Sequence, residues 1–170
     1  MARNIEIKAG IGNFEALQPK VAALADHGPV EIAQDDVFFR CEAGRLKLRT
    51  FAETVGELIF YQRPDLPGPK ESFYVRSPAH EPAALREVLS RAYGEIGRVR
   101  KKRLLYRVGR TRVHLDSVES LGDFVELEVV LAERESPQAG IDVARQLMSQ
   151  LGIEPAQFIE GSYLDLIAGR

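Results

Sequence analysis

The stretch that decides the fold is Arg3-Asn4-Ile5-Glu6-Ile7-Lys8, near the start of the chain. If it forms a strand, Asn4, Glu6 and Lys8 share one face and the two isoleucines share the other, because successive strand side chains point to opposite faces. A single charged strand face is ordinarily exposed to solvent. The same alternation recurs in most other strand-like segments, with both signs of charge. This recurrence predicts that the charged faces together line a polar cavity.

The composition is that of one ordinary domain. The chain has 170 residues, 45% of them hydrophobic, and we expect a single domain over residues 1–170. Lysine and arginine total 23 against 25 aspartate and glutamate, so no overall basic character would recruit nucleic acid or an anionic membrane. The one cysteine, Cys41, excludes a disulfide framework and a thiolate metal cluster. With no hydrophobic signal region or membrane-length apolar run, the sequence indicates a soluble, cytoplasmic protein.

Alternation and turn residues predict eight strands, at residues 3–10, 29–41, 44–52, 56–63, 70–77, 97–108, 111–118 and 123–132. The four strands between 29 and 77 are typical of successive antiparallel hairpins. Apolar residues at helical spacing predict helices that begin near Asn13, run from Glu81 to Gly94, begin at Pro137, and run from Ser162 to Ala168. The pattern therefore contains both structure types, with the strands dominant.

Charged side chains stand at alternate positions in the later strands as well. They are Arg45, Lys47, Arg49, Arg63, Arg76, Lys101, Arg103, Arg112, His114, Asp116, Glu126 and Glu128. Eight strands can close a barrel that holds a small ligand, and helices would then cover its apolar outer face. For any one strand, an open sheet with its charges in water is the simpler alternative. Because an open sheet has no use for such paired charges on so many strands, we predict an α+β fold with an eight-stranded antiparallel barrel and helices packed outside.

A lumen with both signs of charge suits a triphosphate. Phosphate oxygens are bound best by several cations, with arginine forks binding bidentately and lysines acting as point charges. Carboxylates on the same surface would repel the substrate unless a hard divalent cation, Mg²⁺ or Mn²⁺, bridges them to the phosphates. The candidate phosphate-binding residues are Lys8, Lys47, Arg49, Arg63, Arg76, Lys101, Arg103 and Arg112. The candidate metal ligands are Glu6, Asp116, Glu126 and Glu128.

Several motifs stand in one order along the chain: residues 4–8, Gln34–Phe39, Gly44–Arg49, Val113–Asp116 and Leu121–Glu128. In this order they resemble the motifs of the CYTH, or triphosphate tunnel metalloenzyme, superfamily, which begins with Glu-x-Glu-x-Lys and ends with an Asp and a Glu-x-Glu pair. The superfamily includes class IV adenylyl cyclases, thiamine triphosphatases and inorganic triphosphatases. The resemblance covers almost the whole chain. It implies an eight-stranded tunnel, and it implies that Glu6, Lys8, Glu126 and Glu128 take part in catalysis.

Two positions depart from the pattern of that superfamily. Asn4 stands in place of the first Glu, so one metal position would have a neutral amide oxygen and bind the cation more weakly. Phe38 stands where many members have Tyr, which removes a tyrosine that could help a lysine to handle a proton. Water would then need another activator, such as a metal or a carboxylate. His114 can hydrogen-bond within the wall or contact a ligand, and we leave it out of the predicted metal set.

Three functions are compatible with these residues. We favour a metal-dependent enzyme that hydrolyses inorganic triphosphate or a small organic triphosphate. The same lumen could cyclise ATP to cyclic AMP and pyrophosphate, since only the position of the ribose 3′-hydroxyl separates the two reactions. A noncatalytic polyphosphate-binding module is the third reading, which Asn4 and Phe38 favour and the carboxylates oppose. We expect a small-molecule triphosphate or nucleotide as partner, with no nucleic acid and no membrane, and we leave a homodimer open.

Overall fold

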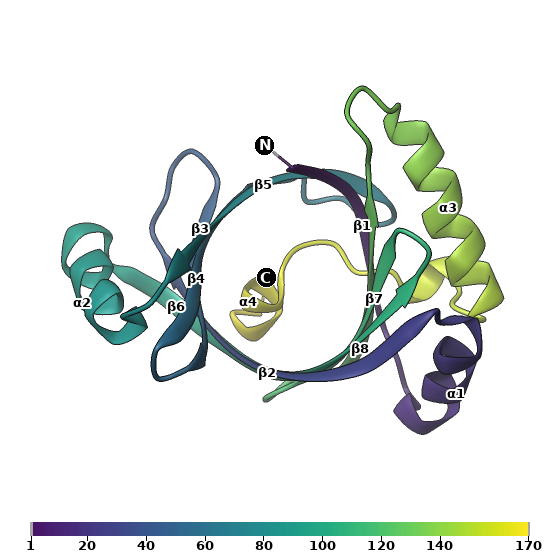
Figure 1. Ribbon diagram of the computed structural model, residues 1–170, viewed down its shortest axis with the longest axis horizontal. Helices are drawn as coiled ribbons and strands as arrows, with labels where there is room; N and C mark the ends of the chain where they lie inside the picture. The colour runs from purple at the N-terminus through teal and green to yellow at the C-terminus, as the bar shows by residue number, and fades with distance from the viewer. Residues whose placement is uncertain (1, 170) are drawn as a thin grey trace.

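The computed structural model describes residues 2–169, in which eight strands form a closed barrel (Figure 1). The strands are β1 (Ala2–Gly10), β2 (His27–Phe39), β3 (Arg45–Ala52), β4 (Val55–Gln62), β5 (Lys70–Ala79), β6 (Glu95–Val108), β7 (Thr111–Val118) and β8 (Gly122–Val130). Around the barrel they follow the order β1-β5-β4-β3-β2-β6-β7-β8, and β8 pairs with β1 to close it. Every neighbouring pair is antiparallel. The predicted α+β barrel is confirmed.

The strand register brings the charged faces of different strands together. Glu6 of β1 lies opposite Glu128 of β8, and Lys8 lies opposite Glu126. On the other side of β8, Arg112 of β7 pairs with Glu128. Because directly opposed residues point to the same side of a sheet, these side chains share the inner face of the barrel. The interior is therefore polar, as the alternation predicted.

The apolar strand faces form the cores outside the barrel. Helices α1 (Phe14–Leu24) and α3 (Pro137–Gln150) cover β1, β7 and β8, and Ile5 and Ile7 are fully buried against them. Burying an isoleucine side chain contributes roughly 1.5–3 kcal/mol. Gly140 of α3 permits the close approach, because a Cβ there would lie 2.6 Å from Cγ1 of Ile5. These contacts stabilise the barrel wall from outside and leave the lumen free for charged groups.

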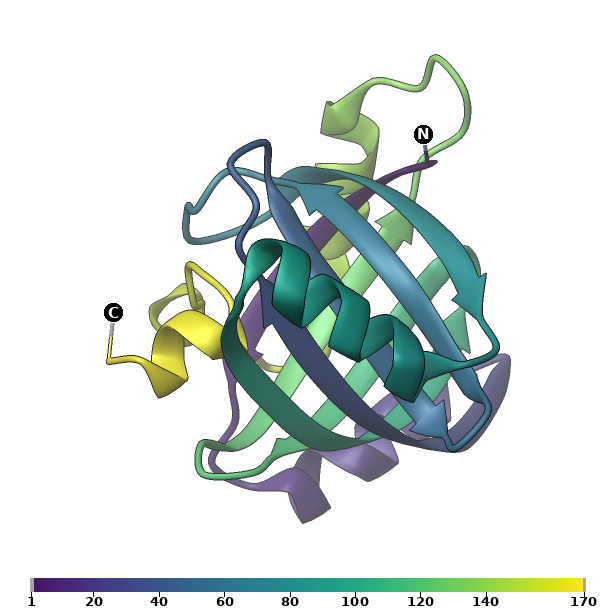
Figure 2. The ribbon, with the colours of Figure 1, turned by 90° about the vertical axis from the view of Figure 1, so that its left-hand side faces the viewer.

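Helix α2 (Pro82–Tyr93) covers a second part of the outer surface, across β2, β3 and β4 (Figure 2). It packs Leu89 against Val37, Phe39 and Leu48. The element ends differ from the predicted ones by up to two residues. Strand β5 runs on to Ala79, which still pairs with β4, whereas β2 and β8 each end two residues before the predicted limit. Within residues 2–169, no helix is both long and apolar enough to cross a membrane.

The C-terminal segment lies across one end of the barrel. It contains a short 3₁₀ helix, η1 (Pro155–Gln157), which the sequence did not predict, and α4 (Tyr163–Ile167), which appears within the circle of strands in Figure 1 and beyond their ends in Figure 2. Ser162 and Asp165 cap α4 reciprocally. A third apolar cluster closes this end, formed by Phe38, Val99, Val118, Phe124 and Tyr163. The segment thus forms a floor for the tunnel.

Candidate functional site

The barrel encloses a cavity of about 330 Å³, lined by side chains from all eight strands and by Ser162 and Tyr163. Most of the residues that the sequence predicted as site residues line it: Glu6, Lys8, Lys47, Arg49, Arg63, Arg76, Lys101, Arg103, Arg112, Glu126 and Glu128. Asp116 is fully buried behind this lining. Arg76 lies at the rim, with 53% of its side chain exposed and its guanidinium 3.8 Å from Glu57. The structure therefore gathers the predicted residues around one cavity.

Asp36 of β2 holds two of the candidate phosphate-binding cations in place. Its carboxylate accepts hydrogen bonds from Nε and Nη2 of Arg49, both at 2.7 Å, and from Nζ of Lys47 at 2.9 Å. Although burial opposes ionisation, Lys47 and Arg49 hold the pKa of Asp36 far below its usual range. A buried charge requires a paired counter-ion. Asp36 supplies it and also fixes the direction of the two cations, a role that the sequence did not predict.

Asp116 of β7 holds a second pair of candidate phosphate-binding cations in place, Arg103 and Lys101. It accepts hydrogen bonds from Nε and Nη2 of Arg103 at 2.6 and 2.7 Å and from Nζ of Lys101 at 3.1 Å. The hydroxyl of Tyr163 donates a further bond at 2.8 Å. Burial raises the pKa of the carboxyl, but Arg103 and Lys101 outweigh it and hold that pKa far below its usual value. In this arrangement Asp116 is a counter-ion, and its role as a metal ligand stays a prediction.

Three carboxylates converge on another part of the lumen, two of them buried and that of Glu128 partly buried. Glu6 is paired with Nη1 of Arg63 at 2.6 Å, Glu128 with Nε of Arg112 at 2.7 Å, and Glu126 with Nη2 of Arg103 at 3.1 Å. Burial raises the pKa of Glu6, and the charges of Glu126 and Glu128 raise it further against the opposing effect of Arg63. Converging like charges of this kind are a place where a cation is stabilised.

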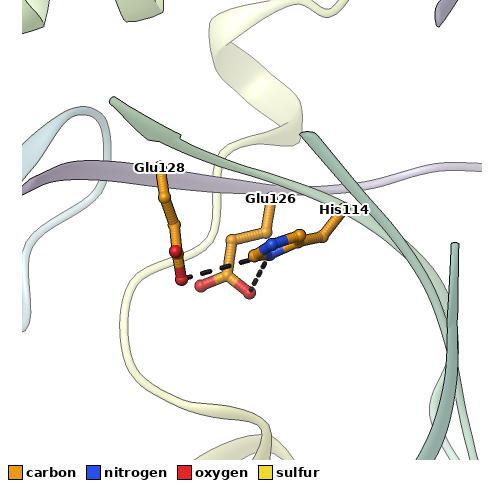
Figure 3. A group of neighbouring side chains, drawn as sticks. All are labelled: His114, Glu126 and Glu128. Carbon is orange, nitrogen blue, oxygen red and sulfur yellow. Dashed lines mark ion pairs between the residues drawn. The ribbon is translucent and has the colours of Figure 1, made fainter. Parts of the chain in front are cut away.

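His114 of β7 joins this group, although the sequence analysis left it out. The side chain is buried, and its Nδ1 atom lies 3.9 Å from Oε2 of Glu126 and 4.0 Å from Oε1 of Glu128 (Figure 3). Burial and the nearby charge of Arg103 lower the pKa of the imidazole. The signal that could have found it is strand register, since His114 lies directly opposite Glu126.

The two departures from the superfamily pattern also lie at the cavity. Asn4 is 2% exposed, and its Oδ1 atom has no hydrogen-bond partner among residues 2–169. Phe38 of β2 lies in the third apolar cluster, and the centroid of its ring is 5.5 Å from Nζ of Lys47. Tyr61 lies on β4, and the centroid of its ring is also 5.5 Å from Nζ of Lys47. A tyrosine therefore stands near Lys47, but on a different strand from Phe38.

Tyr163 is the lining residue that sequence reasoning missed most completely. Its ring lies 4.0 Å from Nζ of Lys8 and 4.8 Å from Nζ of Lys101, distances at which a cation is attracted to an aromatic face. Next to it, Nη2 of Arg63 donates a 2.8 Å hydrogen bond to the carbonyl of Gly161. No local pattern could place this segment against β1 and β6, because the contacts join residues far apart in the chain.

The barrel and its lumen define the class of protein as a closed tunnel lined by buried cations and carboxylates. The profile of the CYTH domain matches residues 2–163, and the chain belongs to the CYTH domain family. Members of this family are typically enzymes, triphosphatases or cyclases, that bind triphosphates or nucleotides. A comparison with curated proteins gave no match.

Solved structures share this fold over nearly the whole chain. The PH1012 protein from Pyrococcus horikoshii OT3 is 23% identical, with a TM-score of 0.86 over 96% of this chain and 98% of its own. A Pyrococcus furiosus protein is 22% identical, with a TM-score of 0.83 over 96% and 99%. HpAC1 from Hippeastrum, described as a proposed adenylyl cyclase with a dominant triphosphatase activity, is 17% identical, with a TM-score of 0.69 over 100% and 97%. At these identities the likeness shows the fold.

Triphosphate tunnel enzymes of this family depend on a metal ion, and the residues present here fit one. Glu6, Glu126 and Glu128 offer carboxylate oxygens, and Asn4 offers an unpaired amide oxygen on the same inner face of β1 as Glu6. Such oxygen donors are typical ligands of hard divalent cations. Burial raises the pKa of Glu6 and the charges of Glu126 and Glu128 raise it further, and a bound cation would relieve this repulsion between the carboxylates.

Proposed function

We propose that this chain is a divalent-metal-dependent hydrolase of inorganic triphosphate or of a small organic triphosphate bound inside the tunnel. The observation that supports this most directly is the division of charge within one cavity. Carboxylates gather on β1 and β8, and Lys47 and Arg49 lie on β3, across the barrel from β8. Each carboxylate pairs with an arginine, but counter-ions alone would not have to converge on one part of the lumen, whereas a metal-assisted reaction on a phosphate chain uses converging carboxylates beside the cations.

The residues of the chain bind and orient the substrate. Arg49, Arg103 and Arg112 present planar forks to phosphate oxygens, and Lys8, Lys47 and Lys101 add point charges. Asp36 and Asp116 keep these cations in fixed directions before substrate arrives, so little reorganisation is needed on binding. When bound, Mg²⁺ or Mn²⁺ would supply polarisation of a phosphoryl oxygen and orientation of the attacking group.

Hydrolysis requires that a water oxygen form a bond to the terminal phosphorus while the bond from that phosphorus to its bridging oxygen breaks. Inorganic triphosphate then gives diphosphate and phosphate. Negative charge that develops on the transferred group is offset by the surrounding arginines. Phe38 cannot handle a proton, and we take the carboxylates Glu6, Glu126 and Glu128 on the lumen wall as the acceptors of the proton that the attacking water gives up.

Cyclisation of ATP to cyclic AMP is the second candidate. Ile32, Phe51 and Leu105 line the same cavity as the charged groups, so a nucleoside could find apolar contacts there. In this reaction the ribose 3′-hydroxyl replaces water, attacks the first phosphorus and displaces pyrophosphate. The bound phosphates would use the same cations in either reaction.

A product assay separates these activities. Purified protein is incubated with Mg²⁺ or Mn²⁺ and, in separate samples, inorganic triphosphate, thiamine triphosphate and ATP, and phosphate, pyrophosphate and cyclic AMP are resolved. The proposal expects phosphate from at least one triphosphate. Cyclic AMP with pyrophosphate would favour the cyclase instead. Binding of triphosphate without turnover under any condition would favour a noncatalytic polyphosphate-binding module and overturn the proposal.

A further inference from the structure

His114 is a buried imidazole whose ring nitrogen faces two carboxylates without bonding to either. The 3.9 and 4.0 Å separations of Nδ1 from Glu126 and Glu128 are too long for hydrogen bonds (Figure 3). Among residues 2–169, Nδ1 has no hydrogen-bond partner, and the side chain is only 4% exposed. An unsatisfied buried polar atom is costly. This nitrogen is therefore expected to bind something that the polypeptide does not provide.

The three donor atoms lie close enough together to converge on one ion. All lie within 4.8 Å of one another. Ligands about 2.1 Å from a common octahedral ion stand about 3 Å apart when adjacent and about 4 Å apart when opposite. Adjacent strands hold the group together, since His114 and Glu126 are directly opposed in register. Side-chain rotations that shorten the separations toward these values would bring all three atoms to an ion between them.

The partners of the group agree with this role. Glu128 uses Oε2 to bind Arg112 and turns Oε1 toward His114. Glu126 is anchored by Arg103 through Oε2. Arginines thus hold both carboxylates in place, and the oxygen of Glu128 that faces His114 is not used by an arginine.

We propose that Nδ1 of His114 is a ligand, with Glu126 and Glu128, of the divalent cation in the tunnel, and that this nitrogen makes the site prefer Mn²⁺ over Mg²⁺. The inference rests on the proposed function for the presence of the cation and adds the nitrogen ligand and the choice of metal. Mg²⁺ is bound almost entirely by oxygen, whereas Mn²⁺, a transition-metal ion, accepts an imidazole more readily. A site built from carboxylates alone would leave Nδ1 unused.

Direct spectroscopy of the full-length protein tests the ligand without substrate. Mn²⁺ is added, and pulsed electron paramagnetic resonance is used to detect magnetic coupling to a coordinated nitrogen. Protein that carries ¹⁵N-labelled histidine should show the coupling changed to that of ¹⁵N. His114→Asn places an amide oxygen near the position of Nδ1, so an oxygen donor is retained while the nitrogen is lost. His80→Asn, at an exposed histidine outside the tunnel, is the matched control.

Nitrogen coupling in the wild type and the control, and none in His114→Asn, is the expected result. The dissociation constant for Mn²⁺ should rise about 10- to 100-fold in His114→Asn, at least the effect of removing a partner of a metal ligand, and that for Mg²⁺ should change much less. The inference is overturned by absence of Mn²⁺ binding, by absence of nitrogen coupling in the wild type, or by equal weakening of both metals. If His114→Asn does not fold, the labelled wild type decides alone.

Failure of this inference and failure of the proposed function give different results. Metal-dependent triphosphate hydrolysis by a protein without nitrogen coupling would remove His114 from the ligand set and leave the hydrolase proposal intact. Nitrogen coupling in a protein that hydrolyses no triphosphate would keep His114 as a metal ligand and overturn the hydrolase proposal. The two measurements use separate readouts, a spectrum of the substrate-free protein and a product assay.

Discussion

The hydroxyl of Tyr163 in α4 donates a 2.8 Å hydrogen bond to Oδ2 of Asp116 in β7. Both side chains are buried, and Asp116 is also the counter-ion of Arg103 and Lys101. The contact therefore ties the segment that covers one end of the barrel to the network of charges in the lumen. Substitutions in α4 should therefore alter the charge network around Asp116 in the tunnel.

Tyr163→Phe should lower the free energy of unfolding by roughly 1.5–3 kcal/mol, the contribution of a hydrogen bond to a charged group. The aromatic ring and its packing are retained, so the loss reports on the hydroxyl alone. Urea denaturation of Tyr163→Phe, compared with Tyr93→Phe at an exposed tyrosine of α2, measures it. Equal stability of wild type and Tyr163→Phe would show that the bond contributes nothing.

Glu126→Gln and Glu128→Gln should each abolish most of the activity without unfolding the protein. Both side chains keep their shape and lose only the negative charge that a cation needs, so metal affinity should fall at least about 10- to 100-fold. Activity against metal concentration and circular dichroism are the two measurements, and Glu53→Gln in an exposed turn is the control. Near-normal turnover at saturating metal would remove these residues from the metal site.

Arg49→Gln should weaken triphosphate binding by roughly 1–3 kcal/mol, because a charge-assisted contact is lost. Lys47→Gln and Arg103→Gln should behave alike, whereas Arg100→Gln on the outer surface should have no effect. Calorimetric titration with triphosphate measures the affinities. Unchanged affinity in all three lumen variants would mean that the phosphates bind elsewhere.

Arg49→Gln also leaves Asp36 with one of its two cationic partners, so the protein should be less stable as well. Adding Asp36→Asn should recover part of that stability, since the uncompensated buried charge is then removed. Triphosphate affinity should not recover, because the arginine is still missing. A double-mutant cycle of unfolding free energies and affinities separates the two roles.

Asn4→Glu tests the amide at the predicted cation position. Hard divalent cations bind more tightly as ligand charge increases, so the metal concentration for half-maximal activity should fall. If the lumen instead uses the amide to bind water or substrate, the added charge should repel triphosphate and raise the substrate concentration required. Metal titrations at fixed substrate and calorimetry without substrate distinguish these results. Identical metal affinity in the two proteins would place Asn4 outside the metal site.

The pH dependence of triphosphate binding should report on Lys101. Burial and the nearby charge of Arg103 lower the pKa of its ammonium group to about 7. The unfolded chain therefore holds more protons than the folded protein between about pH 7 and the ordinary lysine pKa of about 10.4, and the contribution of Lys101 to stability rises with pH in that window. Bound triphosphate favours the charged ammonium, so binding at pH 8 should take up a proton.

Calorimetry in buffers of different ionisation enthalpy measures this proton uptake. The uptake should fall in Lys101→Met, which keeps the buried apolar stem, and should be unchanged in Lys102→Met on the outer face. Binding at pH 8 that is independent of the buffer in the wild type would contradict the lowered pKa of Lys101.

The sequence by itself determined the barrel and the composition of its lumen. Alternation is a local property with a period of two residues, so Glu6 and Lys8 share a face wherever β1 lies, and the same holds for Glu126 and Glu128 in β8. Because charged faces recur from strand to strand, the sequence predicts that they meet inside a closed barrel. The apolar faces required an outer cover, which the helices provide.

Only the tertiary structure decided which charges are partners and what closes the tunnel. Asp36 binds the directly opposed Arg49 of the neighbouring strand, and Nδ1 of His114 lies 4.0 Å from Glu128 of the next strand, because pairing register brings these residues together. Asp116 could be a ligand or a counter-ion by sequence, and its contact with Tyr163 arises from a segment 47 residues further on. Such contacts depend on long-range packing, which a local pattern of side chains does not encode.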